Sequence, residues 1–424
     1  MSTEIIDLEP GVSAKWVWDS SELKENFWIQ WDELVAASAE PSSFLDSRMM
    51  KSLLDAENRH VAAISWFQEN ALIGVACVED TLAQSINLDK HIESNRFWFS
   101  AISKWIHGRS GRFSFNVRVL GTSLGSGEHG YRWKAGVPEH KKAKWVTDTL
   151  FKAGGFEGRR APKVSMIKDA PIYDDEQLQN KFPDWIPLEF DPEMIVHINP
   201  NWSSIVDYQA ELSKKFRTKI NRILTLSELF EIREFTCADL EIHVHSLIAL
   251  YQEVFDRSGF RLGSLNADTL IQSKKNWGDG FVIKGYYLEG NLKGFQCAYV
   301  DDRDVEAFFV GFRPELIKSH AIYQRMLIEF IHLAILNKCE RVNMGRTALE
   351  IKSTVGAMPR RLQCEVRFRN KWMHKAVAWY TKGYSPAEAE IRTPWNSGAY
   401  ALKRHSEIHA IPASAEVPIR PAAV

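Results

Sequence analysis

A glycine-rich loop, residues 125–130, contains the side chains best suited to acid–base chemistry. Glu128 and His129 stand in it among three glycines. A carboxylate or an imidazole with a pKa near neutrality can accept the proton that an amine sheds when it attacks a carbonyl carbon. The apolar run FSFNVRVLG, residues 113–121, predicts a strand just before the loop, and loops in that position often carry functional residues. A solvated turn is the competing interpretation.

The string MGRTALEIKSTVGAMPRR, residues 344–361, contains Arg346 and Lys352. The Arg346 guanidinium offers a bidentate fork to a phosphate or carboxylate, and Lys352 adds a second positive charge. Both follow a predicted strand, so we expect a binding site at the end of that strand. The alternative is a structural clamp in which Arg346 pairs with Glu350 or Glu365.

The segment ELSKKFRTKINRIL, residues 211–224, predicts a helix with a basic face. Lys215, Lys219 and Arg222 lie about one turn apart on this face. Such a stripe attracts phosphates. A solvated helix face is the alternative, and no RNA-reading motif accompanies the stripe.

The clearest β–α–β pattern lies in the second half of the chain. The nearly all-apolar run VEAFFVGF, residues 305–312, predicts a strand covered on both faces, and residues 319–337 predict the next helix with Ser319 as its N-cap. Backbone N–H groups at a helix N-terminus attract anions, so Lys318 and Ser319 are candidates for holding a phosphate. Tyr323, in the first turn, is a candidate proton donor.

The segments FQENALIGVACVED and YLEGNLKGFQCAYV repeat one another at an offset of 220 residues. Each reads as a strand, a polar turn and a second strand, which is the pattern of a β-hairpin. Two helical patterns precede each hairpin, and a strand and a helix follow it. The same order occurring twice predicts a duplicated mixed α/β unit. The matching pairs are Leu72 and Leu292, Gly74 and Gly294, and Cys77 and Cys297.

This order of elements is the plan of the GNAT acyltransferase fold. GRTALEIKSTVGAMP, residues 345–359, resembles the fG-R-(S/T)-x-x-x-x-K-x-x-x-G-A-x-P signature of the BioF-type and FemAB-like branch of the GNAT superfamily. LYQEVFDRSGF and IYQRML also fall where this branch has similar residues. The resemblance implies an α/β (α+β) tandem GNAT fold with two mixed-sheet halves packed together. We expect an N-terminal domain over residues 1–190, a C-terminal domain over 191–408 and a disordered tail over 409–424.

The resemblance also implies an N-acyltransferase that acts by direct attack of an amine on an acyl donor. Acyl-CoA or another acyl thioester would be the co-substrate, a small-molecule amine the acceptor, and an acyl carrier protein a further partner. Glu128 or His129 would take the proton, and backbone N–H groups near Val310 and Gly311 would polarise the carbonyl oxygen. Tyr323 would protonate the leaving thiolate, while Arg346 and Lys352 would hold a phosphate or carboxylate.

Two alternatives stay open at this point. A typical GNAT enzyme opens the helix after this strand with a glycine-rich turn that holds the coenzyme A pyrophosphate, whereas residues 316–321 contain no glycine. Together with the basic helix, this favours a FemAB-like enzyme that uses aminoacyl-tRNA as its donor. The net charge of −1 and the lack of an inserted coiled-coil arm count against that alternative. The other alternative is a non-catalytic binding protein on the same fold.

Composition and the absence of some motifs narrow the classes of protein to which the chain can belong. The chain has 424 residues and five cysteines at spacings that suit no metal site, so we expect reduced thiols, a cytoplasmic location and no metal cofactor. The start, MSTEIIDLEP, does not read as a signal peptide, and no run of about 18 apolar residues predicts a membrane span. H-E-x-x-H, G-x-S-x-G and Walker motifs are also missing, which excludes the enzyme classes that depend on them. The sequence leaves the oligomeric state open.

Overall fold

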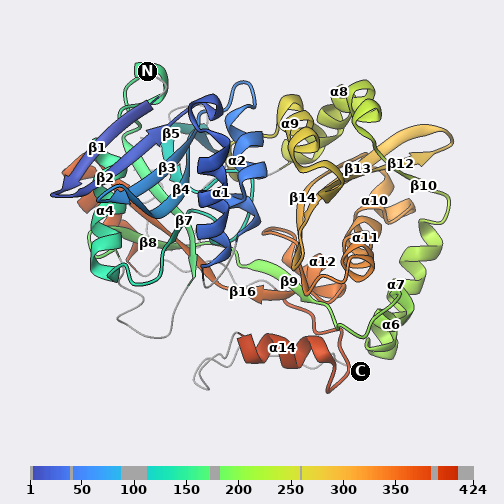
Figure 1. Cartoon of the computed structure of the whole chain (residues 1–424). Helices are drawn as coiled ribbons and strands as arrows, with labels where there is room; N and C mark the ends of the chain where they lie inside the picture. The colour runs from blue at the N-terminus through green and yellow to red at the C-terminus, as the bar shows by residue number, and fades with distance from the viewer. Residues whose placement is uncertain are drawn as a thin grey trace.

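The structure is a computed structural model that describes residues 3–38, 42–86, 112–171, 182–257, 260–382 and 390–408. The described residues form two mixed β-sheets that lie beside each other, with helices packed against each sheet (Figure 1). The sheets belong to two halves of the chain that repeat one order of elements. The expected tail, residues 409–424, lies outside the described residues.

In the first half, two helices stand between the opening strands and the hairpin, as the apolar patterns predict. They are α1 (Glu25–Ala36), which buries Trp28 and Trp31, and α2 (Ser47–Leu54), which begins at an Asp46 side-chain cap. The other elements are β1 (Thr3–Glu9), β2 (Val12–Val17), β3 (Val61–Gln68), β4 (Ala71–Ile86), β5 (Arg112–Leu120), β6 (Tyr131–Trp133), α4 (Glu139–Lys152), β7 (Val164–Pro171) and β8 (Ile186–Glu189).

The second half has the same pair of helices before its hairpin. A capping box of Thr236 and Asp239 begins α8 (Cys237–Phe255), and an Asn266 cap begins α9 (Ala267–Trp277). The other elements are β9 (Glu193–His197), α6 (Ile205–Ala210), α7 (Lys214–Leu226), β10 (Glu231–Glu234), β11 (Phe260–Leu262), β12 (Phe281–Leu288), β13 (Asn291–Val300), β14 (Asp304–Phe312), α10 (Leu316–Ser319), α11 (Ile322–Leu336), β15 (Arg341–Asn343), α12 (Leu349–Thr354), β16 (Met358–Arg360), β17 (Leu362–Phe368), α13 (Lys371–Thr381) and α14 (Tyr400–Ile408).

Details of the two hairpins confirm the internal repeat. Glu69 and Asn70 join β3 to β4 with φ of 49° and 70°, and Glu289 and Gly290 join β12 to β13 with φ of 52° and 74°. Positive φ at both central positions is the turn that matches the twist of paired strands. Each hairpin also has a bulge at the equivalent place. The residues beside the bulges are Trp66 opposite Gly74 and Tyr286 opposite Gly294.

Strands of the second half also pair in the first sheet, which the sequence does not predict. β11 pairs with β4 there, whereas β9 pairs with β15 and β16 in the second sheet. β17 comes near the C-terminus, yet it pairs with β7 and β8 in the first sheet. The strand orders are β1-β2-β3-β4-β5-β7-β17-β8 and β10-β12-β13-β14-β15-β9-β16. The boundary near residue 190 falls between β8 and β9, and it stays a prediction because the chain later returns to the first sheet.

Each sheet contains a parallel pair of strands that separate at their carboxyl ends. The pairing of β5 with β7 reaches Leu120 and Ile167, and that of β14 with β15 reaches Glu306 and Asn343. Beyond Asn343 the chain turns away, whereas β14 continues to Phe312. The loops that follow these strands therefore meet at one place between the halves.

A shared apolar core joins the halves and fixes their relative position. One cluster of buried side chains contains Trp28 and Met49 of the first half together with Leu247 and Phe281 of the second. At about 25 cal/mol per Å² of apolar surface, such burial is the main stabilising contribution to this contact. A site formed between the halves is therefore held by packed elements on both sides.

Candidate active site

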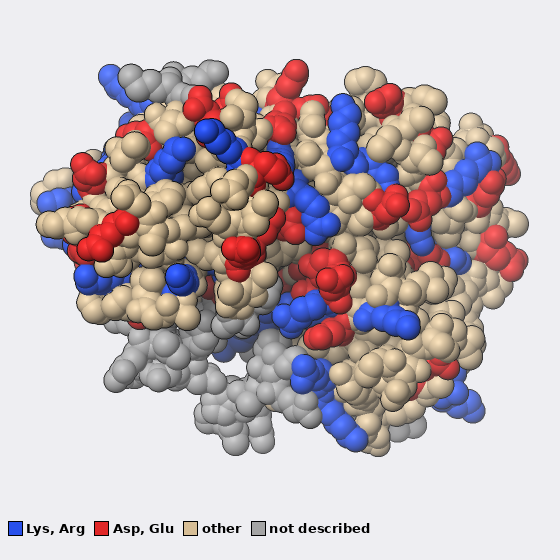
Figure 2. Space-filling view, viewed as in Figure 1, with Lys and Arg blue, Asp and Glu red and all other residues tan. Residues whose placement is uncertain are grey.

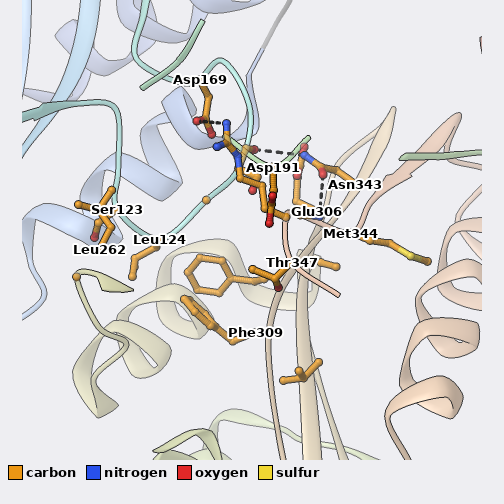
Figure 3. Close-up of a pocket in the computed structure, with 18 of the residues that line it drawn as sticks. Ser123, Leu124, Asp169, Asp191, Leu262, Glu306, Phe309, Asn343, Met344 and Thr347 are labelled. Carbon is orange, nitrogen blue, oxygen red and sulfur yellow. Dashed lines mark hydrogen bonds and ion pairs between the residues drawn. The ribbon is translucent and has the colours of Figure 1, made fainter. Parts of the chain in front are cut away.

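A cavity of about 590 Å³ lies between the halves where the parallel strands separate. The first half contributes residues 123–126 of the loop after β5, with Lys168 and Asp169 at the end of β7. The second half contributes residues 306–310 of β14, part of α11 and residues 343–347 after β15. Figure 3 shows these segments converging. The volume is that of a site for a small molecule.

One end of the cavity is apolar. Leu124 and Leu262 line it from opposite halves, and Phe308 and Phe309 line it from β14 (Figure 3). Consecutive side chains of a regular strand point to opposite faces. Here the register shifts, since Cys297 pairs with Phe309 while Ala298 pairs with Ala307. This bulge allows both phenylalanines to line the same cavity.

Glu306 is the buried carboxyl group of the cavity wall, and the sequence analysis missed it. Its side chain comes from β14 at the point where β15 separates, opposite Asn343. Burial raises the pKa of the Glu306 carboxyl well above its usual range, and Asp304 and Glu193 raise it further. A carboxyl of this kind can give or take a proton near neutral pH. The only signal in the sequence is a single acidic residue inside an apolar strand.

Asp169 connects the two halves beside this carboxyl. It is fully buried and accepts hydrogen bonds from the Gly127 N–H at 2.9 Å and from Lys168 Nζ at 2.8 Å. Its other oxygen is paired with Arg346 of the second half (Figure 3). Burial raises the pKa of Asp169, but Lys168 and Arg346 lower it more, so that the pKa lies below its usual range.

The alternative in which Arg346 pairs with Glu350 or Glu365 is wrong. Glu350 instead accepts a hydrogen bond from Arg392 at 3.0 Å, and Glu365 accepts one from Gln363 at 2.8 Å. These carboxylates are engaged elsewhere because the halves bring Asp169, which is distant in sequence, to the guanidinium. Arg346 therefore does form an ion pair, with a partner that the sequence did not indicate.

Lys352 holds the loop that carries Arg346. Its buried Nζ donates to the carbonyl oxygen of Gly345 at 3.2 Å and to that of Arg346. Burial lowers the pKa of Lys352 to about 7. The loop itself is strained, since Thr347 and Ala348 have φ of 67° and 49°. Non-glycine residues in this region cost about 1–3 kcal/mol each and cluster at functional sites.

The structure places Glu128 and His129 outside the lining of the cavity. His129 is buried against Phe44, and both ring nitrogens are engaged. Because a carbonyl oxygen only accepts, Nε2 donates to the Ser126 oxygen at 2.5 Å, and Nδ1 accepts from Ser42 Oγ at 2.7 Å. Burial lowers the pKa of His129 well below its usual range, and Lys168 and Arg132 lower it further. This geometry favours a structural role for His129.

The start of α11 differs from the prediction. The helix begins at Ile322, and its N-cap is Ala321 with φ of 49°, so the assignment of Ser319 as N-cap is wrong. Ser319 ends the separate short helix α10, and Lys318 is exposed beside it. Tyr323 does line the cavity, and its ring lies 5.6 Å from that of Phe312. Burial raises the pKa of the Tyr323 hydroxyl, which keeps it protonated.

Gly311 lies where helix α8 packs closely against β14. A Cβ at this position would stand 2.5 Å from the Tyr251 nitrogen and 2.7 Å from the Leu250 carbonyl carbon, both backbone atoms. We predict that Gly311→Ala lowers the free energy of unfolding by about 1–3 kcal/mol, as overpacking does elsewhere. Thermal denaturation measures the loss. Gly154→Ala is the matched control, because the nearest neighbour of its Cβ would be a side-chain oxygen 3.6 Å away. Equal melting temperatures for the two variants would contradict the prediction.

The basic face of α7 lies outside the cavity. Lys215, Lys219 and Arg222 are exposed there and belong to none of the cavity walls. Figure 2 shows Lys and Arg interspersed with Asp and Glu over the visible face, rather than gathered in one patch. The binding role assigned to these three residues stays a prediction.

Among the residues that the structure describes, no group of three or more His, Cys, Asp or Glu side chains is arranged to hold a metal ion. In the same part of the chain, no helix has the length and apolarity needed to cross a membrane.

The topology of each half decides the fold. Each half contains, in the same order, two helices, an antiparallel hairpin and a parallel pair of strands that separates around a following helix. The chain has a tandem GNAT fold. No protein-family model matches it, and no curated protein matches its sequence.

Several solved structures share this chain path at low sequence identity. FemX has a TM-score of 0.49 and 8% identity over 83% of this chain and 98% of its own. A tandem GNAT protein from the clavulanic acid biosynthesis pathway has a TM-score of 0.47 and 8% identity over 84% of this chain and 99% of its own. The C-terminal domain of a putative lysylphosphatidylglycerol synthetase from Agrobacterium fabrum has a TM-score of 0.45 and 8% identity over 87% of this chain and 100% of its own.

Proposed function

We propose that this chain is an N-acyltransferase whose reaction takes place in the cavity between its halves. The acceptor amine attacks the carbonyl carbon of an acyl thioester, a C–N bond forms and the C–S bond breaks. Glu306, as the carboxylate, takes the proton from the amine, and an acid in the site protonates the leaving thiolate. The observation that carries the proposal is a buried carboxyl of raised pKa at the edge of an otherwise largely apolar cavity.

Tyr323 fits the role of the acid that protonates the leaving thiolate. Its hydroxyl is kept protonated by burial, and the side chain lines the same cavity as Glu306. Glu306 takes the role of base that the sequence suggested for Glu128 or His129, because neither of those residues lines the cavity. Lys352 supports the site indirectly by holding the backbone of the Arg346 loop.

The apolar end of the cavity suits the hydrocarbon part of an acyl group. Leu124, Leu262 and the two phenylalanines of the β14 bulge offer no charge there. We therefore propose an acyl chain longer than acetyl, since each additional buried CH₂ contributes about 0.8 kcal/mol. Acyl-CoA is the proposed form of the donor, with an acyl carrier protein as the alternative carrier.

Leu124→Trp tests the acyl chain. The indole would fill the apolar end, so we expect kcat/KM for a medium-chain acyl-CoA to fall at least tenfold, with a smaller effect on acetyl-CoA. Release of free thiol in the presence of a mixed amine pool measures both rates. Leu229→Trp is the matched control, because Leu229 is exposed and lies outside the cavity. Equal losses with both donors would contradict the assignment of the apolar end.

Ligand-induced stabilisation tests the donor class independently of the acceptor. A ligand at about a hundred times its dissociation constant adds about 2.7 kcal/mol of apparent stability. We expect this increase in stability with a medium-chain acyl-CoA. Free coenzyme A and a pool of aminoacyl-tRNA are measured for comparison. A shift with the charged tRNA alone would replace the thioester donor by the FemAB-like alternative. No shift and no thiol release with any donor would favour a non-catalytic binding protein.

A further inference from the structure

Arg346 has a buried donor that its protein neighbours leave unused. One terminal nitrogen of its guanidinium is paired with Asp169, whereas its Nε is buried and has no hydrogen-bond partner among the described residues. A buried N–H without an acceptor costs about 1–3 kcal/mol, and native structures rarely leave one in place without a reason. Arg346 lines the cavity, so an acceptor atom of a bound ligand can reach this side chain.

Two cations share one buried counter-ion at this end of the cavity. Asp169 is paired with both Lys168 and Arg346. Asp191 also lines the cavity, but it is exposed, so solvent screens its charge. A guanidinium has five N–H donors, so Arg346 retains donors for an additional anionic group.

The backbone links the loop of this cation to the strand pair that carries the proposed base. Glu306 and Asn343 are neighbours across the parallel strand pair, and Asn343 Oδ1 accepts a hydrogen bond from the Gly345 N–H at 2.9 Å. This bond folds the loop that carries Arg346 back over the end of β15. Figure 3 draws Glu306 and Asn343 on the same side of the cavity, with Asp169 above them.

We infer that the acceptor amine also carries a carboxylate, which binds Arg346 while the amine faces Glu306. The acceptor is thus an amino acid, and this inference rests on the proposed acyl transfer. A carboxylate offers two coplanar acceptor oxygens, which match the planar donors of a guanidinium. One of these oxygens accepts a charge-assisted hydrogen bond from Arg346, whose Nε–H has no other acceptor among the described residues.

Matched acceptors test this inference without any mutation. The assay compares kcat/KM for an amino acid, its carboxamide, its decarboxylated amine and a phosphate-bearing amine of similar length, with one acyl-CoA throughout. We expect the amino acid to exceed its decarboxylated amine by about a hundredfold, which corresponds to one charge-assisted hydrogen bond. Equal values for all four acceptors would overturn the carboxylate while leaving acyl transfer intact. A preference for the phosphate-bearing amine would also overturn it, and acylation of none would contradict the proposed function itself.

Arg346→Met tests the residue assigned to the carboxylate. The ratio of kcat/KM between the amino acid and its decarboxylated amine should fall from about a hundredfold to near one. Because the ratio compares two acceptors in one variant, partial loss of folded protein does not change it. Arg233→Met is the control, since Arg233 pairs with Glu231 on β10 outside the cavity. An unchanged ratio in Arg346→Met would overturn the assignment.

Discussion

Glu306→Gln is expected to lower kcat/KM for acyl transfer by at least a hundredfold. General base catalysis contributes about 10²–10⁴ to a rate, and glutamine keeps the shape of the side chain while losing the ability to accept the proton. The protein should stay folded, because the wild-type carboxyl is already held near its neutral form by burial. Initial rates of thiol release, measured on protein whose melting temperature is checked in parallel, give the result.

The dependence of this reaction on pH follows from the same carboxyl. The pKa of Glu306 is raised, so kcat/KM should increase with pH through a value above the usual 4.3 or so, and this step should disappear in Glu306→Gln. A carboxyl with a raised folded pKa contributes stability that is fully present below about pH 4.3 and is lost as pH rises through the folded pKa. Glu306→Gln should therefore be at least as stable as the wild type at neutral pH.

Glu365→Gln is the matched control for Glu306→Gln. Glu365 is also buried, and burial raises its pKa to about 7, but it lies outside the lining of the cavity. Its replacement should leave kcat/KM unchanged. Equal activity in both variants, or equal loss in both, would show that Glu306 is not the base.

Local patterns in the sequence were sufficient to predict the repeated elements. Apolar spacing predicted α8 and α11, and polar turn residues predicted both hairpins, since these features depend on neighbours within a few residues. The pairing of β11 and β17 with strands of the first sheet could not be predicted in this way. Each is a short strand whose partner lies far along the chain, and nothing in its own sequence specifies that partner.

The candidate site was predicted only in part, for the same reason. Arg346, Lys352 and Tyr323 line the cavity, because they follow or precede elements that the local patterns identified. In the sequence, Glu306 is indistinguishable from an ordinary strand residue. Its place in the cavity depends on the separation of β15 from β14 and on the packing of the halves around it. Asp169 and Arg346 are 177 residues apart in the sequence, so they become partners only through the packing of the two halves.

Asp169→Asn is expected to destabilise the protein more than any other single change considered. The side chain keeps its size, and asparagine tolerates the φ of 59° at this position, so the main change is loss of charge. Lys168 and Arg346 would then stay in the interior without their common counter-ion. Removing one member of a buried ion pair costs about 3–5 kcal/mol, because the remaining charge is left uncompensated. Urea denaturation measures this loss of unfolding free energy.

The acid dependence of stability distinguishes the ion pair from a simple packing effect. The folded pKa of Asp169 is lowered, so its contribution to stability is present above about pH 3.9 and is lost as pH falls through the folded pKa. The difference between wild type and Asp169→Asn should therefore shrink in acid. Asp148→Asn, which breaks an exposed pair with Lys144, is the control and should cost less than about 1 kcal/mol. If both variants lost equally little, the buried pair would contribute no more to stability than a surface pair does.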